Sequence, residues 1–299
     1  MKVTAASLTL LAVAALPELC VAVPAKRDSS TPTEIQILNF ALTLEHLENA
    51  FYTQGLQKYT QQDFLDADLP TWARGRWNQI AQHESTHVSF LESVIGDQAV
   101  QPCTYSFPDT DPMSFVTTSF MLETVGVSAY SGAAHFLSNS DYITSSAAIL
   151  AVEARQSAWI NSAVLKANPW NTAFDTPLDL NHVWTLASGV IVSCPPSNMP
   201  LPVKAFPALS FPAGAQPGQT VQVSFNATTS GQLYVAFIAG LGATFAPLSS
   251  QMTVVIPSSL QGVVFPVVTS SDTMVTDNVT IAGPAFLSFH FNSDGVDEP

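Results

Sequence analysis

The sequence predicts an α+β protein in which a bundle of four long helices is followed by a small antiparallel β-sandwich. Up to about residue 190, apolar side chains recur at helical spacing, as Ile35, Leu38 and Leu42 do. After about residue 198, prolines, serines and threonines separate short β-rich runs such as "QTVQVSFN", "QLYVAFIA" and "MTVVIP". Long helices with short connections are typical of a bundle, and short strands at this spacing are typical of a sandwich.

Proline and capping residues predict where the helices begin. The first helix is expected to have Pro32 at its first position, because Thr31 can cap it and Glu34 follows three residues later. The remaining helices are expected to begin at Pro70, at Pro112 and at Ser140–Asp141, with a shorter fifth helix over 177–191.

The first residues have the pattern of a secretory signal peptide. Lys2 precedes an apolar run over residues 8–16, and small residues follow around Ala22. Lys26-Arg27 forms a dibasic processing site, so the mature chain is expected to start at Asp28. We therefore expect a secreted, extracellular protein. Its segments would be a signal peptide and pro-segment (1–27), a helical bundle (28–193), a linker (194–202) and a β-sandwich-like domain (203–299).

Removal of the leader leaves an acidic chain. The sequence has 9 lysines and arginines and 23 aspartates and glutamates, and without residues 1–27 these counts fall to 6 and 22, a formal charge of −16. A chain with this charge repels phosphate groups, so we exclude nucleic acid as a partner. The longest later apolar run, over 233–247, is short and interrupted by Gly240 and Gly242, so no membrane association is expected.

The cysteines and two sequons fit an oxidising, secretory compartment. Cys20 lies in the leader, which leaves Cys103 and Cys194 as a natural disulfide pair. The alternative is two free buried thiols. Asn226 and Asn278 begin acceptable N-glycosylation sequons in the β-rich part of the chain.

Acidic residues recur at matched positions on the four long helices. Two of the glutamates are followed by a tyrosine seven residues later, and two are followed by a histidine or glutamine three residues later. Their order along the chain is Glu45 with Tyr52, Glu84 with His87, Glu123 with Tyr130, and Glu153 with Gln156.

This spacing suits a metal site inside the bundle. Residues three apart share a helix face, so one helix can offer Glu84 and His87 to the same ion. A carboxylate in apolar surroundings such as those of Glu153 would be costly unless it were paired or bound a metal. The alternative is a set of packed polar residues without metal. Tyr52 and Tyr130 are either hydrogen-bond partners of the ligands or ordinary core aromatics.

Together, the segments "LNFALTLEHLENAFY", "AQHESTHVSFLE", "FMLETVGVSAYSGAA" and "AVEARQSAWI" resemble the ferritin-like superfamily over residues 33–165. The resemblance extends to its secreted branch of plant desiccation-related proteins and fungal stress-response or sexual-development proteins. It implies iron or manganese held by Glu45, Glu84, His87, Glu123 and Glu153, with Glu84 and Glu153 as bridges. Gln156 departs from the family pattern, which has histidine there, so a second ion is expected to be weakly held, rich in water ligands or absent.

Other polar residues of the helical half are assigned no metal. Glu48 is expected to be solvated or to support the ligands, and His46 and His83 are expected to lie off the core face. His135 and His182 are expected to be structural.

Two functions follow as expectations. The first is a secreted protein whose dinuclear, or degenerate single, carboxylate-histidine site handles dioxygen or peroxide or oxidises bound metal, as a di-metal oxidoreductase would. The alternative is a non-enzymatic stress-protective or cell-wall-associated module with a vestigial metal site.

Overall fold

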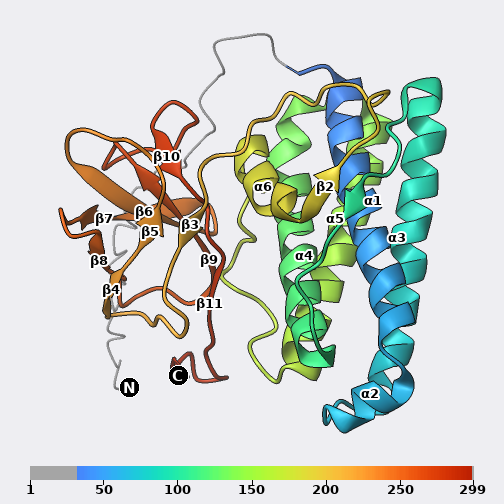
Figure 1. Cartoon of the computed structure of the whole chain (residues 1–299), viewed down its shortest axis with the longest axis horizontal. Coiled ribbons are helices and arrows are strands. Elements are labelled where there is room, and N and C mark those ends of the chain that lie inside the picture. Colours follow the sequence, from blue (N-terminus) through green and yellow to red (C-terminus); the bar gives the residue numbers. More distant parts are fainter. Residues whose placement is uncertain (1–31, 298–299) are drawn as a thin grey trace, which may run out of the picture.

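The computed structural model describes residues 32–297, so the predicted signal peptide and processing site lie outside the described residues. The long helices form one side of the molecule, and the strands of the C-terminal part form the other (Figure 1). The α-helices are α1 (Glu34–Lys58), α2 (Gln61–Asp66), α3 (Ala73–Ile95), α4 (Pro112–Ala133), α5 (Ser140–Trp159) and α6 (Leu180–Ala187). Short 3-10 turns follow α3, α4 and α6, and a π-helical turn over Ile160–Val164 continues α5.

The helix starts differ in part from the prediction. Pro112 is the first residue of α4, behind an Asp111 cap, as expected. The cap of α1 is Thr33, not Thr31, because the Thr33 side chain and Gln36 form a reciprocal capping box. Pro70 lies in a turn before α3, and its carbonyl accepts a hydrogen bond from the Ala73 amide. The short helix α2 was not predicted.

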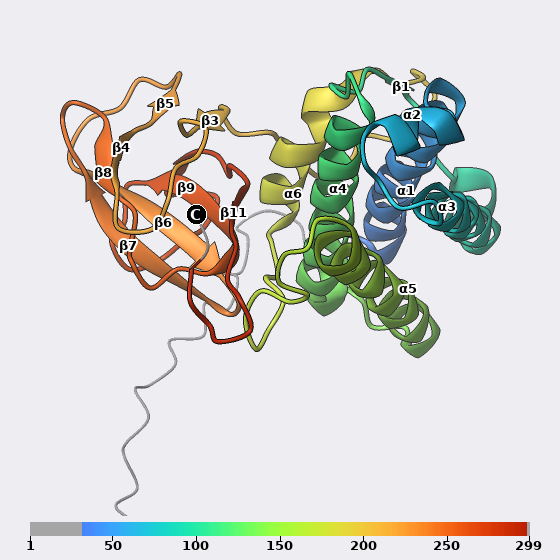
Figure 2. The same ribbon diagram turned by 90° about the horizontal axis from the view of Figure 1, so that it is seen from below.

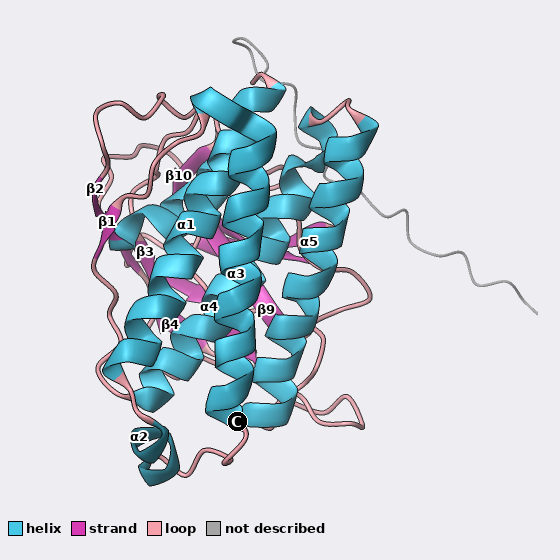
Figure 3. Cartoon of the chain, turned by 90° about the vertical axis from the view of Figure 1, so that its right-hand side faces the viewer, coloured by secondary structure: helices cyan, strands magenta, loops and turns pink. Residues whose placement is uncertain are grey.

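Four long helices form the bundle (Figure 3). Helix α1 packs along α3, α4 packs along α5, and α1 also contacts α4. The bundle core contains large aromatic side chains, including Phe40, Phe51, Trp77 and Phe115, each at most 1% exposed. Helix α1 is buried on nearly all sides between Ile37 and Phe51, so it has almost no solvated face on which a polar residue could lie.

The C-terminal part is rich in antiparallel strands. Its main sheet has the order β10-β9-β6-β7, and β11 pairs with β9 beyond this path. Two further pairs, β3 with β5 and β4 with β8, lie beside it. The strands are β3 (Leu209–Ser210), β4 (Thr220–Gln222), β5 (Ser224–Phe225), β6 (Leu233–Ala239), β7 (Gly242–Leu248), β8 (Thr253–Val255), β9 (Gly262–Thr269), β10 (Thr280–Ala282) and β11 (Leu287–Phe289). The α+β class predicted from the sequence is confirmed.

Strand β9 joins the two parts because both of its faces are buried. Val263 and Phe265 belong to the same apolar core as the bundle helices, whereas Val264 and Val268 belong to the core of the β-rich region. Alternate residues of a strand point to opposite sides, so one strand can contribute to both cores. Helices α4 and α6 lie on the side of the bundle that faces the strands (Figure 2). The predicted domain limits remain a prediction.

A disulfide ties the loop between α3 and α4 to the segment that follows α6. Strands β1 (Thr104–Tyr105) and β2 (Ile191–Ser193) pair antiparallel, and Cys103 and Cys194 beside them form the disulfide that the sequence predicts. Both sequon asparagines, Asn226 and Asn278, are exposed. Between residues 32 and 297, no helix has both the length and the apolar character needed to cross a membrane.

Candidate metal centre

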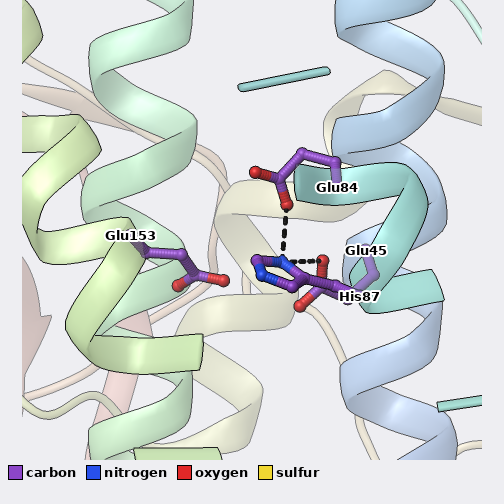
Figure 4. Close-up of side chains that lie close together, drawn as sticks. All are labelled: Glu45, Glu84, His87 and Glu153. Carbon is purple, nitrogen blue, oxygen red and sulfur yellow. Dashed lines mark hydrogen bonds and ion pairs between the residues drawn. The ribbon is translucent and has the colours of Figure 1, made fainter. Parts of the chain in front are cut away.

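Side chains from three helices converge inside the bundle. Glu45 comes from α1, Glu84 and His87 from α3, and Glu153 from α5, and Figure 4 shows them directed toward one another. One ligand atom from each of the four lies within 4.8 Å of the others. The three carboxylates are fully buried, and the side chain of His87 is 12% exposed. This donor set of oxygen atoms and one imidazole nitrogen fits a divalent transition metal.

His87 links two of the carboxylates. Its Nδ1 lies 3.0 Å from Oε2 of Glu84 and 3.2 Å from Oε2 of Glu45. Burial lowers the pKa of His87, but the hydrogen bonds and charges of these carboxylates outweigh it and raise the pKa to about 10. Burial raises the pKa of Glu45 to about 7, although the contact with His87 opposes this shift. Without metal, the imidazolium therefore occupies the place of a cation between the two acids.

Glu123 on α4 joins the cluster through Gln156 on α5. The amide Nε2 of Gln156 donates to Oε1 of Glu84 at 2.8 Å and to Oε2 of Glu123 at 3.0 Å. Its Oε1 faces Nδ1 of His83, 3.3 Å away. Gln156 thus directs its hydrogen-bond donor toward the carboxylates, where a histidine would offer a lone pair to an ion.

The two tyrosines are hydrogen-bonded to the predicted ligands. Tyr130 on α4 donates to Oε1 of Glu45 on α1 at 2.5 Å, and Tyr52 on α1 donates to Oε1 of Glu123 on α4. Tyr52 also lies 3.1 Å from the hydroxyl of Ser119. Both tyrosines are thus hydrogen-bonded to glutamates of the cluster. That they orient metal ligands stays a prediction.

Glu48 lies inside the bundle, so the first of its two expected alternatives, a solvated side chain, is wrong. Its side chain is only 4% exposed, because almost no face of α1 is exposed to solvent. Burial and the charges of Glu123 and Glu45 raise its pKa well above 4.5. Glu48 and Glu153 meet beside Gly126 of α4, where an added Cβ would lie 2.6 Å from Oε2 of Glu153 and 3.2 Å from Oε1 of Glu48. The three-residue spacing from Glu45 to Glu48 is the signal that could have identified it.

The oxygens of Glu153 test whether the cluster suits a metal. Both are buried and have no hydrogen-bond partner among residues 32–297. Burial and the neighbouring glutamates, Glu48 first among them, raise the pKa of Glu153 well above 4.5. A buried carboxyl group without a partner is costly, and coordination of a cation would remove that cost. The residues present therefore fit a metal ion.

The remaining histidines lie in other surroundings. His46 is buried, with Nε2 3.1 Å from the carbonyl of Val100, and His83 is exposed. His182 is buried with Nε2 3.3 Å from Oγ1 of Thr280, and burial lowers its pKa to about 4. His135 was expected to be structural, but it is exposed.

Comparison with known proteins agrees with this arrangement. Residues 33–166 match the family model described as a ferritin-like domain. The chain is also similar to Protein rds1 of Schizosaccharomyces pombe (strain 972 / ATCC 24843), with 25% identity over 267 residues. The similarity covers 72% of this chain and 65% of rds1, so the chain spans less than two thirds of that relative. Residues 33–166 therefore form a helical region that is similar to ferritin-like domains.

Proposed function

We propose that this is a secreted ferritin-like protein that binds iron or manganese at the buried carboxylate-histidine cluster. Its reaction class would be the handling of dioxygen or peroxide, or the oxidation of the bound metal. The observation that carries the proposal is Glu153, whose two buried oxygens have no hydrogen-bond partner in the described range 32–297 and face other carboxylates. A divalent ion supplies the positive charge that this arrangement lacks.

One ion would be held by the four residues whose ligand atoms already converge, namely Glu45, Glu84, His87 and Glu153. When bound, iron or manganese supplies one-electron redox chemistry that no amino-acid side chain offers as readily. His87 must release the proton from Nδ1 to become a ligand, because only the neutral imidazole has a free lone pair. Tyr130 and Tyr52 then hold Glu45 and Glu123 in orientation.

A second ion would involve Glu48 and Glu123, with Gln156 beside them. Glu48 adds a carboxylate that the sequence interpretation did not count, and it lies next to Glu153. The amide of Gln156 already donates to Glu84 and Glu123 and supplies no strong donor to a metal. We therefore propose a weak second position.

The proposal of secretion rests on two features. The leader pattern at residues 1–27 is that of a signal peptide. The Cys103–Cys194 disulfide is typical of proteins from oxidising compartments.

The position of Gln156 also favours a second candidate function. If its hydrogen bonds to Glu84 and Glu123 persist when metal is present, one ion alone would be bound, and the site would lack the pair of ions needed for two-electron chemistry with dioxygen or peroxide. The protein would then be a non-enzymatic stress-protective or cell-wall-associated module with a vestigial metal site.

Metal content after native secretion tests the proposal. Mass spectrometry of the purified protein should detect iron or manganese, and Glu84→Ala should remove it. Glu92→Ala is the matched control, because Glu92 lies on the same helix with its side chain 42% exposed. Equal metal content in Glu84→Ala and Glu92→Ala would refute the site. Consumption of dioxygen or peroxide by the loaded protein then separates the oxidoreductase from the non-enzymatic module.

A further inference from the structure

A cleft opens between α3 and α5, on the outer side of Gln156. Its volume is about 640 Å³, which lies in the range of small-molecule sites. Helices α3 and α5 pack mainly against α1 and α4 respectively, so the groove between them is not filled by a helix–helix contact.

The two walls of the cleft repeat one helical spacing. Residues three, four and seven apart lie on one face of a helix. On α3 this face presents Arg76, Gln79, Ile80 and His83, and on α5 it presents Val152, Arg155, Gln156 and Trp159. Each wall therefore carries one arginine, and His83 on one wall faces Gln156 on the other, whose amide donates to Glu84.

The cleft is basic in an acidic protein. Arg76 and Arg155 are two of the six lysines and arginines between residues 32 and 297, and no aspartate or glutamate of that range lines the cleft. Arg155 is exposed and has no hydrogen bond or ion pair within the described range. By contrast, the guanidinium of Arg74 stabilises the fold, because it donates hydrogen bonds to the backbone carbonyls of Tyr59 and Leu56.

Aromatic surface accompanies these charges. Trp72 is 46% exposed, and its ring centroid lies 6.0 Å from that of Trp159. Trp159 is held in place by an edge-to-face contact of 5.0 Å with the buried Trp77. The two indoles present ring surface to the cleft beside Ile80, and aromatic ligands stack favourably on such surface.

We propose that this cleft binds a small aromatic carboxylate. The guanidinium groups of Arg76 and Arg155 recognise the carboxylate through charge-assisted hydrogen bonds, and the indoles of Trp72 and Trp159 hold the ring. The occupant lies one side chain away from the buried acids, because Gln156 lines the cleft and also donates to Glu84. Binding of this ligand depends on the cleft alone and not on metal. The binding experiment therefore tests the cleft independently of the proposed redox function.

Titration of metal-free, full-length secreted protein with 4-hydroxybenzoate tests the site. Saturable binding should be seen by calorimetry and should change the tryptophan fluorescence. Loss of one charge-assisted hydrogen bond weakens binding by about tenfold or more, so Arg155→Gln and Arg76→Gln should each raise Kd by about that factor. The neutral analogue 4-hydroxybenzamide should bind more weakly by a similar factor, and Trp72→Ala should also weaken binding.

Lys204→Gln is the matched control, because it removes the same charge at an exposed position outside the cleft lining. It should leave Kd unchanged. Unfolding curves establish that each variant is folded, and the two arginine variants serve as independent tests because both residues are exposed. The proposal is overturned if binding is not saturable, if Arg155→Gln and Arg76→Gln bind like Lys204→Gln, or if inorganic phosphate competes as tightly as the aromatic probe.

Discussion

The hydroxyl of Tyr130 on α4 donates a hydrogen bond of 2.5 Å to Oε1 of Glu45 on α1. Tyr52 on α1 makes the reciprocal hydrogen bond to Glu123 on α4. On each helix the glutamate precedes the tyrosine by seven residues, which is about two helical turns, so both lie on one face. Because α1 and α4 run antiparallel, each glutamate meets the tyrosine of the other helix. The seven-residue spacing in the sequence therefore encodes a contact between helices.

The first prediction concerns these hydroxyl groups. Tyr130→Phe should lower metal affinity by about 10- to 100-fold, because a residue that orients a ligand is lost. The variant should also lose about 1–3 kcal/mol of unfolding free energy in metal-free form, since a buried carboxylate oxygen loses its donor. Competition titration with a metal chelator and denaturant unfolding measure the two effects.

Tyr234→Phe is the control for this prediction, because the Tyr234 hydroxyl makes no hydrogen bond within residues 32–297. It should behave like the unmodified protein in both measurements. If Tyr130→Phe binds metal as tightly as Tyr234→Phe does, Tyr130 has no role in orienting Glu45.

The second prediction is the pH dependence of the metal-free protein. Burial raises the folded-state pKa of Glu45 from 4.5 to about 7, so the folded chain holds its proton more tightly than the unfolded chain. Its contribution to stability is therefore complete below pH 4.5 and is lost as the pH rises through about 7. His87 acts in the same direction at higher pH, because hydrogen bonds to Glu45 and Glu84 raise its pKa from 6.5 to about 10, although burial opposes them.

Thermal unfolding with a chelator present, measured between pH 5 and 9, should thus show falling stability as the pH rises. Metal affinity should change in the opposite direction, because binding displaces the proton of His87. A metal-free protein whose stability rises with pH over this interval would contradict the raised pKa values of Glu45 and His87.

The helices and most of the cluster could be predicted because they depend on local spacing. The Glu84-x-x-His87 pair and the matched Glu–Tyr pairs follow from positions along single helices. The sequence leaves the burial of Glu48 open, because it depends on how α3 and α4 enclose α1 and leave that helix almost no solvated face. The hydrogen bonds of Gln156 and the cleft beside it depend on the separation of α3 and α5. No periodicity within either helix encodes that separation.

The third prediction uses Gly126, whose missing side chain makes room for two carboxylates. A Cβ at this position would lie 2.6 Å from Oε2 of Glu153 and 3.2 Å from Oε1 of Glu48. Gly126→Ala should displace the flexible end of Glu153. Metal affinity should fall by at least about tenfold, which is the loss typical of variants in which a metal ligand is no longer held in orientation. The fold should tolerate the change, because alanine favours a helix over glycine by about 1 kcal/mol.

Gly75→Ala on α3 provides the control, since no atom lies within 4 Å of the added Cβ. Both alanine variants should unfold at least as cooperatively as the unmodified protein. A Gly126→Ala variant with unchanged metal affinity would show that the present position of Glu153 does not matter for binding.

The last prediction concerns Gln156, whose amide donates to Glu84 at 2.8 Å and to Glu123 at 3.0 Å. Gln156→His replaces a hydrogen-bond donor by an imidazole lone pair directed at the same two carboxylates. We expect the number of bound ions per chain to rise, because a second position would then have an imidazole ligand as the first has His87. Metal stoichiometry measured by mass spectrometry after saturation and gel filtration gives the result.

Gln82→His adds the same side chain at an exposed position of α3 and controls for metal bound by any surface histidine. An equal rise in Gln82→His and Gln156→His would contradict a second core position. In metal-free protein, Gln156→His should cost stability, because Glu84 and Glu123 lose the amide that donates to both of them. Gln156→His is thus recognised by two results together: it binds more metal, and its metal-free form is less stable. These results would show that the amide of Gln156 stabilises Glu84 and Glu123 where a second ion would otherwise do so.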